Sequence, residues 1–128
     1  MAGKLEGKSV LLVDDDQEIL GAMEVSFSSA GAAVSKASDG NTAVETALKE
    51  DPDLIVLDMM LPKRSGFLVL EQLKKGKPPN SRPHVIMITG NEGKRHQQYA
   101  LAIGAADYLY KPFPMSRLME SAEKVLGE

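Results

Sequence analysis

Apolar runs alternate with amphipathic segments along the whole chain. Three of these runs are uninterrupted and occupy residues 9–13, 54–57 and 85–88. Two weaker runs occupy residues 32–37 and 108–110. An uninterrupted apolar run is typical of a strand that is covered on both faces. Five strands that alternate with helical segments predict an α/β domain with a parallel sheet.

The helical segments between these runs have recognisable boundaries. Asp16 is placed to cap the first helix, whose apolar stripe includes Leu20 and Met23 and which Gly31 should end. In the second helix, the spacing predicts that Ala43, Val44, Ala47 and Leu48 face inward. This second helix is expected over about 41–50. The later helices are expected over about 67–75 and 92–103, and the last has Pro114 in its first turn and extends to about residue 126.

Polar residues stand where four of the apolar runs stop. They are Asp14-Asp15-Asp16, Asp58, Thr89 and Lys111. Ligands of open α/β sheets bind at the carboxyl ends of the strands, so we expect these side chains to converge. Carboxylates can hold a hard divalent cation and one can act as a nucleophile, while the ammonium neutralises a phosphoryl group. The set indicates phosphoryl transfer onto an aspartate.

The acidic pair after the first strand favours a metal over a bare phosphate. Phosphate-binding loops place glycines or hydroxyls there, so that backbone N–H groups meet the anion. Asp14 and Asp15 would instead suit Mg²⁺, which takes one or two carboxylates and keeps several waters. Solvated carboxylates at a helix start are the simpler alternative. Asp16 is interpreted mainly as that helix cap.

Asp58, Lys111 and Thr89 each have an ordinary structural interpretation as well. A lone Asp can form a turn, a single lysine is usually on the surface, and threonine favours strands. As a functional set, Asp58 would attack phosphorus, Lys111 would offset the charge of the phosphoryl oxygens, and Thr89 would donate a hydroxyl hydrogen bond to them.

Composition narrows the function classes. The 128 residues predict one domain, and a formal charge of −3 lacks the basic footprint of a nucleic-acid binder. The absence of cysteine excludes disulfides and thiol chemistry. The polar N-terminus is unlike a signal peptide, and no run could span a bilayer. We therefore expect a soluble, cytoplasmic protein without direct nucleic-acid binding or membrane insertion.

In this order and on these strand ends, the motifs resemble the receiver domain of two-component response regulators, in the layout of the single-domain chemotaxis type. The resemblance runs from about Lys8 to Leu126, which makes residues 1–7 an N-terminal extension and 8–128 the domain. The matching landmarks are Asp14, Asp15, Asp58, the loop from Leu61 to Gly66, Thr89, Tyr108 and Lys111-Pro112.

The resemblance implies a flavodoxin-like doubly wound fold with five parallel strands in the order 2-1-3-4-5. It implies Mg²⁺ held by Asp14, Asp15, Asp58 and the backbone carbonyl of Met60, and phosphorylation at Asp58. Thr89 and Tyr108 would form the switch. The phosphoryl group would come from a sensor histidine kinase, a histidine phosphotransfer protein or a small phosphodonor.

The same resemblance implies that a protein target binds the face made by the fourth helix, fifth strand and fifth helix. The domain would then be a self-modifying phosphoacceptor with intrinsic autodephosphorylation rather than an enzyme. One alternative is an adaptor on this fold that works without phosphorylation; its candidate surfaces are two basic stretches, 74–82 and 94–96, which we interpret as solvated.

Two further alternatives share part of the pattern. An Mg²⁺-dependent phosphatase with an aspartyl nucleophile would use the Asp-x-Asp spacing of residues 14–16, but Gln17 stands where Thr or Val is expected and no acidic pair follows the lysine. A flavodoxin-like cofactor carrier has the same fold. The acidic first loop and the absence of tryptophan argue against it.

Overall fold

A computed structural model of the chain describes residues 3–78, 81–90 and 94–127. Strands and helices alternate throughout these ranges. In chain order they are β1 (Ser9–Val13), α1 (Gln17–Ser29), β2 (Ala33–Ala37), α2 (Gly40–Glu50), β3 (Leu54–Asp58), α3 (Gly66–Lys74), β4 (His84–Thr89), α4 (Lys94–Ala102), β5 (Asp107–Tyr110) and α5 (Met115–Leu126). The expected start of the fourth helix at residue 92 lies outside the described residues.

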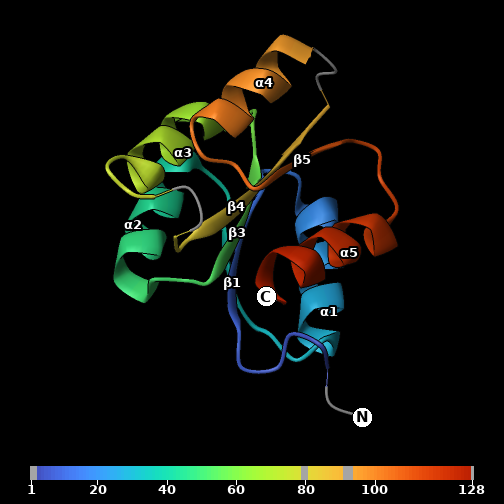
Figure 1. The fold of residues 1–128 in the computed structure, drawn as a ribbon. Helices are drawn as coiled ribbons and strands as arrows, with labels where there is room; N and C mark the ends of the chain where they lie inside the picture. Colours follow the sequence, from blue (N-terminus) through green and yellow to red (C-terminus); the bar gives the residue numbers. More distant parts are fainter. Residues whose placement is uncertain (1–2, 79–80, 91–93, 128) are drawn as a thin grey trace.

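The five strands form one parallel sheet in the order β2-β1-β3-β4-β5. Helices α2, α3 and α4 lie on one face of the sheet, and α1 and α5 lie on the other (Figure 1). Strand β3 is central and buried along its whole length, which explains why its sequence is uninterruptedly apolar. The flavodoxin-like doubly wound fold is thereby confirmed, and the carboxyl ends of the strands share one edge.

The N-terminal segment contributes to the core. Leu5 is only 2% exposed and packs with the apolar side chains between the sheet and helices α1 and α5. Its backbone N–H donates to the carbonyl of Ala30 at 2.9 Å, just after α1. The segment 1–7 therefore supplies a core side chain, and the domain boundary after residue 7 stays a prediction.

The helix starts follow local capping chemistry. Asp16 caps α1 as expected, since its Oδ1 accepts from the N–H groups of Glu18 (2.9 Å) and Ile19 (3.3 Å). Asp39 caps α2 in the same way, a cap that was not predicted from the sequence. The N–H of Thr42 donates to Asp39 at 2.8 Å, and this bond lowers the pKa of the Asp39 carboxyl.

Two expectations about side-chain burial were wrong. Leu48 is 69% exposed, because in α2 the buried stripe consists of Ala43, Val44 and Ala47 and leaves the next position outside. Lys74 is 5% exposed and is not part of a solvated basic stretch. Its Nζ donates to the carbonyls of Ser81 (2.6 Å) and Pro83 (3.2 Å), and burial lowers its pKa.

Among the described residues, no helix is both long enough and apolar enough to cross a bilayer. The longest, α1, has 13 residues.

Candidate functional site

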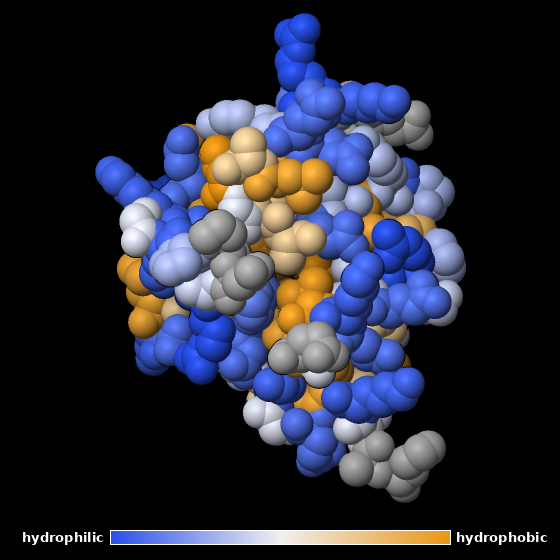
Figure 2. All heavy atoms as spheres, in the orientation of Figure 1, coloured by the Kyte–Doolittle hydropathy of each residue, from blue (hydrophilic) through white to orange (hydrophobic). Residues whose placement is uncertain are grey.

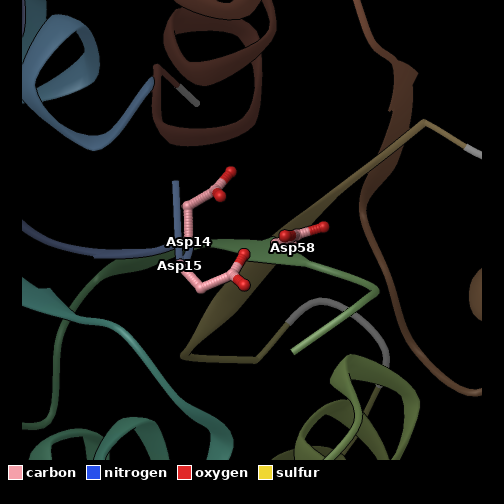
Figure 3. A group of neighbouring side chains, drawn as sticks. All are labelled: Asp14, Asp15 and Asp58. Atoms are coloured by element: carbon pink, nitrogen blue, oxygen red, sulfur yellow. The ribbon is translucent and has the colours of Figure 1, made fainter. Parts of the chain in front are cut away.

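Three carboxylates meet at the carboxyl edge of the sheet. Asp14 and Asp15 follow β1, and Asp58 ends the adjacent strand β3 (Figure 3). One oxygen from each lies within 4.8 Å of the others. Asp14 and Asp58 are 0% and 3% exposed, whereas Asp15 is exposed to solvent. The side chains therefore form a pocket with two buried acids at its base and one at its mouth.

Lys111, in the loop after β5, reaches this pocket. Its Nζ lies 2.9 Å from Asp14 Oδ2 and 3.5 Å from Asp58 Oδ2. The other oxygen of Asp14 accepts from the N–H of Asp16 at 2.9 Å. One ammonium thus faces two buried carboxylates, and Asp14 Oδ2 accepts no well-aligned hydrogen bond despite the short ion pair. A buried carboxylate oxygen in that condition has capacity for a further cation.

The pKa values of the pocket residues also favour a bound cation. Burial, reinforced by the charge of Asp14, raises the pKa of Asp58 to about 6. The nearby Lys111 and the N–H of Met60, which donates to Asp58 Oδ1 at 3.2 Å, limit that rise. For Lys111, burial acts to lower the pKa, but Asp14 and Asp58 outweigh it and the pKa is raised. The set of oxygen ligands fits a hard divalent cation such as Mg²⁺.

A glycine shapes the back of the pocket. A Cβ on Gly66 would lie 2.3 Å from the carbonyl oxygen of Asp58, so no larger residue fits without displacing that strand end. The N–H of Gly66 donates to the carbonyl of Met59 at 2.9 Å. From the sequence, Gly66 was recognisable only as the end of the loop that begins at Leu61, because a close approach between two backbone segments leaves no local sequence signal.

Thr89 ends β4, which lies beside β3, and Tyr108 lies on β5, the next strand along; both are buried, at 0% and 4% exposure. The carbonyl of Thr89 accepts from the N–H of Lys111 at 2.7 Å, which connects the end of β4 to the lysine loop. The Tyr108 hydroxyl donates to the Met59 sulfur at 3.6 Å. Burial raises the pKa of Tyr108, and a side-chain hydrogen bond with Thr89 acts against that rise.

The structure thus gathers Asp14, Asp15, Asp58 and Lys111 in one pocket, with Thr89 at the adjoining strand end. Asp16 lies outside it as a helix cap. Met59 was missed: an apolar residue within an apolar loop has no sequence signal for a contact with a tyrosine far along the chain.

Fold and pocket together define an α/β domain with an aspartate site that suits a hard cation. The model of the response regulator receiver domain matches residues 10–123, and the chain belongs to that family of two-component signalling domains. It is 39% identical over 106 residues to the alkaline phosphatase synthesis transcriptional regulatory protein PhoP of Bacillus subtilis. That match covers 83% of this chain and 43% of PhoP, so the chain spans less than half of that relative's length.

Solved structures agree with this assignment. The CheY-like receiver domain protein of Methanospirillum hungatei is 29% identical, with a TM-score of 0.83 over 92% of this chain and 93% of that one. The receiver domain of the sensor histidine kinase PA1611 of Pseudomonas aeruginosa is 28% identical, with a TM-score of 0.82 over 95% of this chain and 99% of that one. The latter was solved with a magnesium ion coordinated in its active-site cleft.

Proposed function

We propose that this receiver domain accepts a phosphoryl group on Asp58, in an Mg²⁺-dependent reaction, and passes the signal to a protein partner. The observation that carries the proposal is the setting of Asp58. It is a buried carboxylate whose negative charge is made costly by burial and by Asp14 and is partly offset by a single lysine. Additional positive charge near this carboxylate would stabilise both its ionised form and the negative charge of an incoming phosphoryl group.

Asp14, Asp15, Asp58 and the backbone carbonyl of Met60 would hold the Mg²⁺. The three carboxylates offer oxygens within 4.8 Å of one another, and Asp14 Oδ2 has unused acceptor capacity. When bound, the ion supplies charge neutralisation to the phosphoryl oxygens. The magnesium in the PA1611 receiver domain supports the same use of the pocket here.

In the proposed reaction, an oxygen of Asp58 attacks phosphorus and forms an acyl phosphate. The bond from phosphorus to the donor's leaving group breaks, and a phosphohistidine donor takes back its electron pair as imidazole. Lys111 would offset the negative charge of the phosphoryl oxygens, since its ammonium already lies near Asp58. The hydroxyl of Thr89 would then donate to a phosphoryl oxygen. The phosphoryl group would thus be carried on the domain's own side chain, until water hydrolyses the acyl phosphate to inorganic phosphate and restores the Asp58 carboxylate.

The donor would be a sensor histidine kinase, a histidine phosphotransfer protein or a small phosphodonor. The output surface would be the face of α4, β5 and α5. In this part of the molecule a hollow of about 830 Å³ is lined by residues that include Leu101, Ala105, Arg117 and Val125. Figure 2 shows apolar atoms along the middle of this face, between flanks that are mainly hydrophilic. An apolar strip with polar borders suits a protein partner.

Acetyl phosphate and intact mass test the proposal. The wild-type chain with Mg²⁺ should gain one phosphoryl group, and chelation of the metal should prevent the gain. Asp58→Asn should gain none, whereas Asp16→Asn, which keeps a capping side chain outside the pocket, should react like wild type. Equal phosphorylation of the Asp58 variant and the wild type would show that the acceptor is elsewhere.

A further inference from the structure

A continuous series of side-chain contacts leads from the phosphoacceptor strand to helix α4. It begins at Met59, the residue after Asp58, whose sulfur accepts the Tyr108 hydroxyl at 3.6 Å. The Tyr108 and Tyr110 rings then meet edge to face, with centroids 5.4 Å apart and planes at 76°. Finally the Tyr110 hydroxyl donates to Oε1 of Gln97, on α4, at 2.8 Å.

The first member of this series is held firmly at the strand end. The N–H of Met59 donates to the carbonyl of Ile88 at 2.9 Å, and its own carbonyl accepts from Gly66 at 2.9 Å. Its side chain is 3% exposed and packs with Tyr108 in the core beneath α2, α3 and α4. A shift of the strand end that carries Asp58 therefore also moves the acceptor of the Tyr108 hydroxyl.

The last member reaches a helix that is only shallowly packed. Ala100 is the one buried residue of α4 (Lys94–Ala102), and its other side chains are exposed or half-buried. Toward α3, the rings of His96 and Tyr99 contact Phe67, with centroids 5.8 Å and 5.3 Å apart. Loosely packed elements are the ones that open or shift at low free-energy cost. The hydrogen bond from Tyr110 to Gln97 therefore joins α4 directly to the edge strand β5, whereas the ring contacts with Phe67 join α4 to α3.

Resting on the proposed function, we propose that Met59 and Tyr110 are positioning residues of the switch. They link Asp58 to α4 through the buried ring of Tyr108, so that phosphorylation changes the placement of α4. This assigns Tyr110 to the switch together with Thr89 and Tyr108. Coupling along such a series is shown by non-additive effects of substitutions, not by contact alone.

The test is a double-mutant cycle on the full chain with Met59→Leu, Tyr110→Phe and the pair combined. Leucine keeps the volume of Met59 without the acceptor sulfur, and phenylalanine keeps the Tyr110 ring without its hydroxyl. Amide chemical shifts of α4 are measured with Mg²⁺ and saturating beryllofluoride, a phosphoryl mimic. They give the ratio of switched to unswitched protein, while shifts around Asp58 report occupancy independently.

Each single variant should lower the switched ratio about fivefold, within the range for one lost hydrogen bond. The double variant should lose no more than the larger single loss, because both substitutions interrupt the same series. Tyr99→Phe is the matched control on α4, and Met23→Leu is the control in the opposite core; both should leave the ratio unchanged.

The outcomes separate the two proposals. A wild-type chain that takes up no beryllofluoride would overturn the proposed function and, with it, the inference. Full occupancy with an unchanged ratio in both single variants would overturn only the inference. The same holds for losses that multiply to about twenty-fivefold in the double variant, since independent contacts behave in that way.

Discussion

Replacing Asp58 with asparagine should stabilise the metal-free protein, although it removes the proposed phosphoacceptor. In the native state the pKa of Asp58 is about 6, against 3.8 for an unperturbed carboxyl. Each pKa unit corresponds to about 1.4 kcal/mol, so ionising Asp58 inside the fold costs about 3 kcal/mol. Asparagine carries no charge, and its amide oxygen can still accept from the N–H of Met60.

The sign of the pH dependence follows from the direction of the shift. A raised pKa means that the native state binds more protons than the unfolded chain between about pH 4 and pH 6. The contribution of Asp58 to the free energy of unfolding therefore falls as pH rises through that window. The variant lacks this fall, so its advantage should grow from nearly zero at about pH 4 to about 3 kcal/mol above pH 6.

Urea unfolding across this pH range, with the metal chelated, measures the difference. Asp16→Asn is the control, and it should change the free energy of unfolding by less than about 0.5 kcal/mol because asparagine caps helices equally well. Added Mg²⁺ should stabilise the wild type more than the Asp58 variant, since it binds the native carboxylate. A variant less stable than wild type at about pH 7, or a difference independent of pH, would refute the electrostatic reasoning.

Three further predictions concern the pocket and the N-terminus. Asp15→Ala should weaken Mg²⁺ binding more than Asp16→Ala, and equal losses in a metal titration would contradict their assignment as ligand and cap. Lys111→Ala should still fold, with a metal-free free energy of unfolding lower by about 3 kcal/mol, because two buried carboxylates lose their cation; circular dichroism and urea unfolding check this, and unchanged stability would count against it. Leu5→Ala should cost about 2–4 kcal/mol in the same unfolding assay, whereas a change below about 0.5 kcal/mol would show that the N-terminal segment packs only loosely.

Much of this molecule could be predicted from local pattern. The three uninterrupted apolar runs became central strands β1, β3 and β4, because a strand covered on both faces needs no polar alternation. Asp58 was recognisable as a functional residue because it ends such a run, where burying a charged side chain costs free energy. The cap of α1 could be predicted equally well, since capping depends on residues within one turn.

Contacts between segments that are distant in the chain could not be predicted from the sequence. Lys74 looks like any surface lysine, and it is buried only because the chain after α3 returns to offer it two carbonyls. Leu48 fits the apolar spacing of α2, yet the buried stripe is narrow enough to exclude it. Leu5 seemed to belong to a polar extension and became part of the core.

The strands, their alternation with helices and the identity of the acids, hydroxyl and lysine at the strand ends could all be read from the amino-acid order. Hydrophobic periodicity and side-chain chemistry are local properties, so they can be recognised in the linear sequence. The folded arrangement was needed to establish how far the pKa of Asp58 is raised, that one lysine faces two buried carboxylates, and that Met59 contacts Tyr108. These are distances between residues about 50 to 100 positions apart in the chain, and they exist only after the sheet has formed.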